Sequence, residues 1–307
     1  MRRGGESRWR WRRRWGVAAL AVALIGCSST PTREEKATKV LMIGNSFSIS
    51  VMSHLPEVAA AAGVDLDIAS LYIGGCSLKR HWENVEKDDE EDFAPYIFSR
   101  SCLGRGYKSK SNLCAVLRMQ DWDIVTIQQA SRDSWKGETY EPYGTKLIEK
   151  IRELAPKAKI YVQETWSYTP WDKRLEKWGI DQNEMYARLH DAYGKFAAHH
   201  GLKVIPFGTS VQQWRRRLPV KYGENSFGGD VVGGGHQEER DHFKRDASYR
   251  WVPNCDVCHL GRKGEYFQAL VWAATLFDAD LTELEYKPAF VTDDDLKLMK
   301  EIAMGLK

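Results

Sequence analysis

At residues 39–46 the sequence reads KVLMIGNS, an apolar run followed by a polar turn. A bounded apolar run of this length is typical of a buried β-strand, so we expect a strand at residues 39–43. Gly44-Asn45-Ser46 then predicts a turn, and residues 47–62 predict a helix that ends at Gly63. A strand that leads through a tight turn into a helix is the opening half of a βαβ unit, which predicts a parallel sheet.

The rest of the chain repeats this alternation of strands and helices. Further strands are expected at residues 66–72, 123–128, 158–164 and 202–207, and helices at 143–154, about 181–200 and about 260–277. The sequence therefore predicts the α/β class, as a three-layer sandwich in which helices cover both faces of a mostly parallel, five-stranded sheet. Residues 39–307 are expected to form a single domain, with insertions at about 83–121 and 222–253.

The basic residues are concentrated at the N-terminus. The chain has 45 Lys and Arg against 42 Asp and Glu, a net charge of +3. Residues 1–27 hold seven arginines and one acid, so the remainder carries 38 basic against 41 acidic residues. A nucleic-acid-binding domain needs a basic surface on its folded part, and the composition therefore argues against nucleic acid as a partner. A second basic run, at residues 215–217, is expected to lie on a solvated helix surface.

The N-terminal segment has the features of an export signal. Its arginines precede an apolar run at residues 15–25, which is too short to span a membrane as a helix. The run ends in LIGC, which resembles the bacterial lipobox, and this resemblance implies that Cys27 is the lipidated first residue of the mature protein. We therefore expect a signal peptide at residues 1–27, a polar tether at 28–38, and a lipid-anchored protein in the periplasm or at the cell surface.

Two short motifs carry residues suited to ester hydrolysis. Ser46 lies between the first strand and the first helix, where ligands bind in open parallel sheets and where a serine hydroxyl is placed to attack an acyl carbon. Asp256 and His259 lie just before the last predicted helix, at a spacing that lets the carboxylate orient the imidazole that takes the serine proton. Each motif also has a simpler interpretation, because serine and aspartate are common N-cap residues.

The cysteines near His259 leave further alternatives open. Residues 255–259 read CDVCH, which matches the pattern of covalent haem attachment, and the same cysteines and histidine could contribute to a structural zinc site. We favour a disulfide that joins Cys255 and Cys258 to each other, or one of them to Cys76. Cys102 and Cys114 could close a short loop in the same way.

Four blocks of sequence, taken in order, resemble the SGNH/GDSL hydrolase superfamily, in particular its branch of exported bacterial proteins. They are Gly44-Asn45-Ser46, Gly74-Gly75-Cys76-Ser77, Gln128-Gln129 and Asp256-x-x-His259, and they cover most of residues 39–278. The resemblance implies the flavodoxin-like SGNH hydrolase fold, with Ser46 as nucleophile, His259 as general base and Asp256 as its orienting partner. It also implies that the amides of Ser46 and Gly75 bind the oxyanion.

The third block departs from the family pattern, which places an asparagine there to donate a further hydrogen bond to the oxyanion. This chain reads IQQASRD at residues 127–133. Gln128 is our candidate for the donor, with Gln129 in reserve, and a strict alignment would instead bring Arg132 to this position. Loss of one such donor costs about 3–4 kcal/mol in comparable sites, so the departure also bears on whether the chain is active.

Together these features predict an exported serine esterase that removes acyl groups, in particular acetyl, from a carbohydrate. Glu164 and Trp166 follow the fourth strand and are expected to line the substrate cleft. The expected partners are the acylated carbohydrate and, through the lipid anchor, the membrane, and no metal or organic cofactor is expected. The alternatives are a lipase, thioesterase or acyltransferase with the same triad, and a non-catalytic glycan-binding lipoprotein on an SGNH scaffold.

Overall fold

The described part of the chain comprises residues 37–102, 105–218, 230–233, 243–245, 251–253 and 257–306 of a computed structural model. The predicted signal peptide with Cys27, most of the predicted tether and much of the 222–253 insertion lie outside these residues. Asp256 and Cys255 also lie outside them.

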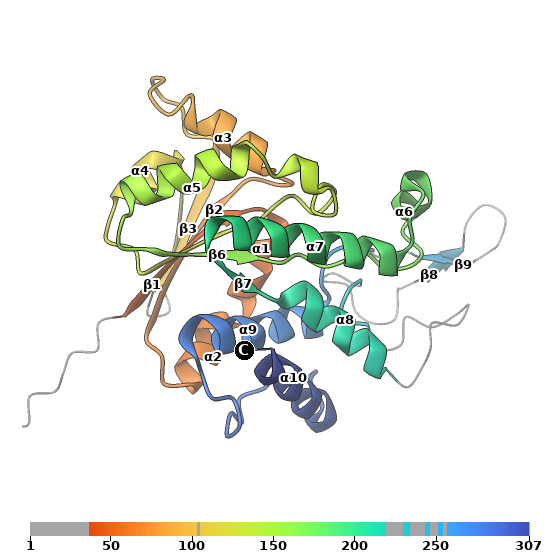
Figure 1. Cartoon of the computed structure of the whole chain (residues 1–307). Coiled ribbons are helices and arrows are strands. Elements are labelled where there is room, and N and C mark those ends of the chain that lie inside the picture. Colours follow the sequence, from red (N-terminus) through yellow and green to blue (C-terminus); the bar gives the residue numbers. More distant parts are fainter. Residues whose placement is uncertain are drawn as a thin grey trace, which may run out of the picture. The chain divides into compact units, whose positions relative to one another are not determined.

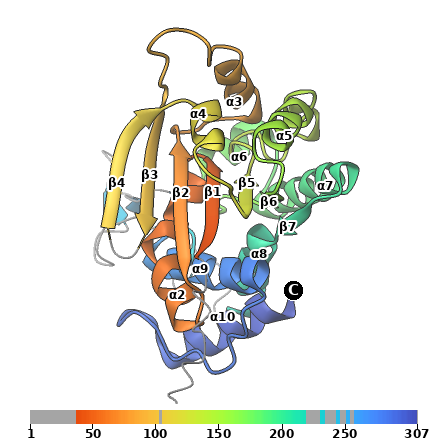
Figure 2. The same cartoon turned by 90° about the vertical axis from the view of Figure 1, so that its left-hand side faces the viewer.

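A seven-stranded sheet forms the centre of the fold, in the order β4-β3-β2-β1-β5-β6-β7 (Figure 2). The strands β2, β1, β5, β6 and β7 run parallel, while β3 and β4 are antiparallel to their neighbours. The predicted α/β class is confirmed, and each of the five predicted strands is present. Their bounds are β1 Thr38–Gly44, β2 Leu66–Tyr72, β5 Ile124–Ile127, β6 Lys159–Gln163 and β7 Lys203–Ile205.

The prediction of five strands was wrong, because the 83–121 insertion adds a hairpin to the sheet. Its strands are β3 (Tyr96–Cys102) and β4 (Arg105–Ser111). In β3, Tyr96 and Phe98 are buried whereas Ile97 between them is exposed, and the polar Ser99 is buried as well. The serines and charged residues of the hairpin hide its apolar residues in the sequence, and β4 forms the sheet edge, where charged residues are common.

Helices cover both faces of the sheet (Figure 1). One face carries α3 (Leu78–Val85), α4 (Leu113–Arg118), α5 (Tyr143–Leu154) and α7 (Gln182–His200). The other carries α2 (Leu55–Ala61), α8 (Phe207–Arg217), α9 (Arg262–Phe277) and α10 (Asp293–Gly305). Val40, Leu41 and Val125 of the central strands are fully buried between these layers. The predicted three-layer arrangement is confirmed.

The predicted helix at residues 47–62 is instead three short helices: α1 (Ser46–Ile49), the 3-10 helix η1 (Ser50–Ser53) and α2. Pro56 lies in the first turn of α2. Proline lacks an N–H group and its ring crowds the preceding turn, so a new helix begins there. The remaining elements are η2 (Gly137–Thr139), α6 (Lys173–Trp178) and a separate two-stranded sheet of β8 (Phe243–Arg245) and β9 (Trp251–Pro253).

The C-terminal helix α10 was not predicted, although its N-terminus carries a recognisable signal. Thr292 and Asp295 form a capping box, in which each side chain accepts from the backbone N–H of the other residue. None of the helices in the described ranges is both long and apolar enough to cross a membrane.

Candidate active site

The loops that follow β1, β2, β5 and β6 meet at one edge of the sheet, because the carboxyl ends of parallel strands point the same way. Ser46 is the first residue of α1, separated from the end of β1 by Asn45, and Gly75 lies in the loop after β2. Gln128 follows β5, and Glu164 follows β6. The structure therefore brings three of the four sequence blocks to the same edge.

His259 reaches this edge from the far end of the chain. Its Nε2 atom lies 2.7 Å from Ser46 Oγ, across 213 residues of sequence. Both residues are partly exposed, so the pair can be reached from solvent. This distance is within the range over which an imidazole can take a serine proton.

Two aromatic side chains, Phe47 and Trp166, help to hold the His259 loop in position. The ring of Phe47 lies 5.3 Å from that of His259 and stacks on Trp166 with centroids 4.1 Å apart. Trp166 Nε1 donates a 2.8 Å hydrogen bond to the carbonyl of Cys258, the residue before His259. Trp166 is fully buried, so the structure corrects its prediction as a cleft-lining residue. Its role is to hold the His259 loop against α1.

Asn45 joins the loops that carry the site. Its Nδ2 donates to the carbonyl of Cys76 in the loop after β2 (3.0 Å). Its Oδ1 accepts from the N–H of Phe47 (3.0 Å) and from Nε2 of Gln128 after β5 (2.7 Å). The side chain is buried and is also the N-cap of α1. The amide supplies both a donor and an acceptor here, which aspartate in its ionised form cannot do.

Gly75 has φ +57°, the left-handed conformation that favours glycine. A β-carbon at this position would lie only 3.1 Å from Nη1 of Arg132. The backbone N–H groups of Gly75 and Ser46 donate to no partner within the described part of the chain. These two backbone N–H groups are therefore available as hydrogen-bond donors.

Gln128 does not face the open site. It is buried, and its Nε2 is bound to Asn45. Gln129 is also buried, because its Oε1 accepts from the N–H groups of Leu78 and Ala130 and its Nε2 donates to Thr139. The structure thus corrects the prediction that Gln128 supplies the oxyanion donor. Through these hydrogen bonds, both glutamine side chains instead connect neighbouring loops.

Glu164 is likewise buried rather than cleft-lining. Its carboxylate accepts from Nδ1 of His190 (2.7 Å) and from the N–H of Thr209 (2.6 Å). The hydrogen bond that His190 donates to Glu164 is the largest cause that raises the pKa of His190. Partial burial lowers this pKa, and the negative charges of Glu164 and Asp191 raise it further. The prediction of Glu164 as a substrate-binding residue is therefore corrected: it ties α7 to the start of α8.

A buried ion pair that the sequence analysis missed holds the segment beside His259. Arg215 Nε lies 3.1 Å from the carboxylate of Asp230, and both side chains are almost fully buried. Arg215 also donates to the Ser167 hydroxyl (2.8 Å). Gly233 in turn donates to the carbonyl of His259 (2.8 Å). Arg215 therefore helps to position the His259 loop, whereas the sequence predicted a solvated helix surface.

Cys76, Cys114 and Cys258 are buried, and none of these three forms a disulfide. The predicted disulfides that would use these residues are therefore not formed. Burial raises the pKa of Cys76 to about 12, so it remains a thiol at neutral pH. Within the described residues, no group of three His, Cys, Asp or Glu side chains is arranged to hold a metal ion.

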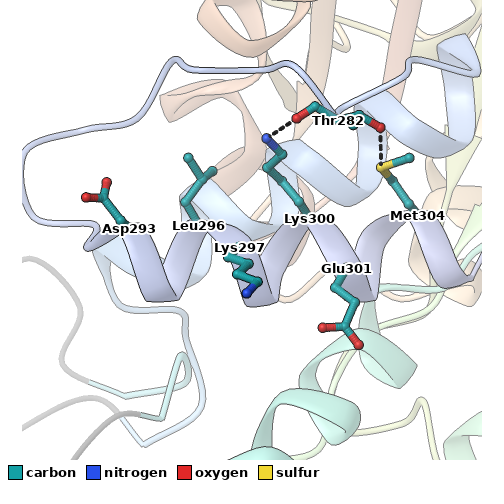
Figure 3. A pocket seen from close by; sticks show the side chains of 7 residues that line it. All are labelled: Thr282, Asp293, Leu296, Lys297, Lys300, Glu301 and Met304. Carbon is teal, nitrogen blue, oxygen red and sulfur yellow. Dashed lines mark hydrogen bonds between the residues drawn. The ribbon is translucent and has the colours of Figure 1, made fainter.

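A shallow hollow on α10 lies away from these residues and is lined by helix side chains and Thr282 (Figure 3). Lys300 Nζ is bound there to the carbonyls of Thr282 and Leu284. Glu301 pairs with Arg217 of α8. Lys300 and Glu301 of this hollow therefore connect α10 to neighbouring segments.

Comparisons with known proteins place the chain in a family. Residues 39–231 match the family described as a domain of unknown function, DUF4886, and the chain belongs to this family. The crystal structure of a DUF4886 family protein from Bacteroides uniformis is 28% identical, with 88% of this chain and 94% of that chain covered and a TM-score of 0.71. A comparison with curated proteins gives no match.

A second solved structure connects the fold to a wider group. It is a candidate SGNH hydrolase from Slackia heliotrinireducens, 20% identical, with 78% of this chain and 100% of that chain covered and a TM-score of 0.50. The predicted resemblance to the SGNH hydrolases is confirmed at the level of the fold.

We predict that Asn45→Ala lowers the free energy of unfolding by about 2–4 kcal/mol, because it leaves the Cys76 carbonyl and the Gln128 amide buried without their partner. Urea unfolding measures this loss. The control is Asn112→Ala, which removes a partly exposed N-cap of α4 and should cost about 1 kcal/mol. Equal losses in the two variants would contradict the role given to Asn45.

We predict that the contact between His190 and Glu164 stabilises the fold at low pH. Because the pKa of His190 is raised in the folded state, the contribution is complete below the ordinary value of 6.5 and is lost as pH rises through the folded-state pKa. Urea unfolding between about pH 5 and pH 9 should show this loss in the wild type and in His199→Gln, an exposed control on the same helix. It should be absent from His190→Gln, and an unchanged pH profile in that variant would refute the prediction.

Proposed function

We propose that the chain is an exported, lipid-anchored serine esterase that removes acyl groups, in particular acetyl, from a carbohydrate. The observation that carries the proposal is the 2.7 Å contact between Ser46 Oγ and His259 Nε2 next to free backbone amides. A serine used only as a helix cap does not need an imidazole at its hydroxyl. In α1 the cap is Asn45 rather than Ser46.

The proposed reaction uses the residues of this edge in two steps. Ser46 Oγ attacks the ester carbonyl carbon while its proton passes to His259 Nε2, and the carbonyl π electrons move to the oxygen. The amides of Ser46 and Gly75 donate to this oxyanion. The carbonyl then re-forms as the bond to the sugar oxygen breaks, this oxygen takes the proton from His259, and the sugar leaves as an alcohol while an acyl-serine remains. Water, deprotonated by the same imidazole, releases the acid and restores Ser46.

In this proposal Asp256 orients His259 and stabilises its protonated form. The support is the sequence spacing of three residues together with the position of His259 against Ser46. Substituting Asp256 by Asn should therefore lower the turnover number for an ester substrate strongly and change the Michaelis constant less.

The proposed carbohydrate substrate is supported by aromatic residues near the site, and the proposed export by the N-terminal sequence. Partly exposed tryptophan rings lie beside the loop after β5, with Trp135 and Trp178 5.5 Å apart and Trp178 5.8 Å from Tyr168. Such rings offer flat apolar faces of the kind that pack against sugar rings. The arginine-rich N-terminus and the LIGC motif support export and attachment of a lipid at Cys27.

We predict that Ser46→Ala lowers the rate of 4-nitrophenyl acetate hydrolysis by at least about 1,000-fold, because it removes the hydroxyl that forms the acyl intermediate. The control is Ser53→Ala, an exposed serine of η1, which should keep the wild-type rate. Acetate release from a panel of acetylated polysaccharides then tests the substrate class with the same three proteins. Equal rates for wild type and Ser46→Ala on every ester would overturn the esterase proposal, and would favour a binding protein.

We predict that the chain, expressed in a bacterium with its own N-terminus, is found in the membrane fraction and takes up a radiolabelled fatty acid. Cys27→Ala should abolish the label and release the protein from the membrane, because the anchor is the acylated cysteine. Cys114→Ala, which alters a buried cysteine of the domain, serves as the control and should keep the label. Recovery of the wild-type protein unlabelled from the cytoplasm would refute this part of the proposal.

A further inference from the structure

Arg132 is an exposed cation that lies against the oxyanion side of the site. Its Nη1 is 3.1 Å from the position that a β-carbon on Gly75 would occupy. The side chain is 57% exposed, and its Nε lies 3.4 Å from the carboxylate of Asp133. The ion pair with Asp133 uses Nε of the guanidinium, whereas Nη1 is the atom that lies near Gly75.

The backbone that carries Arg132 is held on both sides. The Ser131 hydroxyl is 2.9 Å from the Tyr168 hydroxyl, and the N–H of Asp133 donates to the carbonyl of Ala130 (2.8 Å). The Ser134 hydroxyl donates to the carbonyl of Ser131 (2.9 Å). These bonds fix the backbone from which the Arg132 side chain extends to Gly75.

The other polar side chains of this loop are already used. Gln128 and Gln129 are buried and bind Asn45 and Thr139, respectively. Of the polar side chains at residues 128–133, Arg132 is the one that combines exposure with contact to Gly75. A guanidinium adds a full positive charge to its hydrogen bonds, and charge-assisted bonds are roughly twice as strong as neutral ones.

We propose that Arg132 is a catalytic residue that donates a third hydrogen bond, from its guanidinium, to the oxyanion formed on Ser46 attack. The inference rests on the proposed esterase function. As the bond from Ser46 Oγ to the carbonyl carbon forms, the π electron pair moves to the carbonyl oxygen, and this oxygen accepts from Arg132 and from the Ser46 and Gly75 amides. The charge disperses when the carbonyl re-forms and the alcohol leaves.

The test compares Arg132→Ala, Arg132→Lys and Arg118→Gln in the full-length protein, with 4-nitrophenyl acetate as a neutral ester and 4-nitrophenyl hemisuccinate as an anionic one. Arg118 is an exposed arginine of α4 and is the control. We expect Arg132→Ala to lower kcat by about 100-fold for both esters with little change in KM, because the lost bond forms only in the transition state. Arg132→Lys should lose about 10-fold, because it keeps the charge but not the planar fork.

Chemical rescue and labelling complete the experiment. Added guanidinium at millimolar concentration should restore part of the kcat of Arg132→Ala, and urea should not. The rate at which a fluorophosphonate probe labels Ser46 should fall in the same order as kcat, because the probe also places negative charge on an oxygen.

Three outcomes would overturn the proposal. Rates for the Arg132 variants within twofold of those for Arg118→Gln would show that Arg132 is not catalytic. A rise in KM confined to the anionic ester would make Arg132 a carboxylate-binding residue instead. If wild type and Ser46→Ala neither hydrolyse the esters nor react with the probe, the esterase function itself fails, and the inference fails with it.

Discussion

The side-chain amide of Asn45 is the interaction on which the site depends. A single buried group caps α1 and binds the loops after β2 and β5, so three separate segments are held in one arrangement. Without Asn45, the backbone groups of these short loops would need water as a hydrogen-bond partner. The Asn45 amide provides a fixed partner instead, and a backbone group left unpaired in the interior would destabilise the fold. The nucleophile and the Gly75 amide therefore share a common anchor.

The imidazole is positioned by a second set of contacts that involves the other face of the fold. The His259 loop is bound by Trp166 after β6 and by the segment at residues 230–233, which the Arg215–Asp230 pair holds. A buried ion pair contributes little net stability unless its hydrogen bonds are complete, but its loss leaves a buried charge. These contacts make the geometry of His259 depend on α8 and β6 as well as on its own loop. The 2.7 Å distance between His259 Nε2 and Ser46 Oγ therefore depends on contacts with several elements of the domain.

The fold could be predicted largely because its central strands are buried on both faces. Strands such as β1 then appear in the sequence as continuous apolar runs, which a linear reading detects. The β3–β4 hairpin escaped prediction for the opposite reason, since its residues alternate between core and solvent and carry many charges. The predicted helix at residues 47–62 is interrupted before α2, and Pro56 is the local cause. The prediction of one continuous helix gave more weight to the apolar pattern of these residues than to the proline.

By itself, the sequence determined the alternation of strands and helices, and it identified Ser46 and His259 as candidate residues, because turns and buried strands have local signatures. Gly75 was added by the resemblance to the SGNH/GDSL hydrolases. Only the tertiary structure decided which polar side chains face the site. Glu164, Trp166 and Gln128 follow strands that end at the site, yet all three side chains are buried. The guanidinium of Arg132, by contrast, lies next to Gly75. The physical reason is that the direction of a loop side chain is set by the groups that bind it, such as His190 for Glu164. Those partners are contributed by elements distant in the sequence.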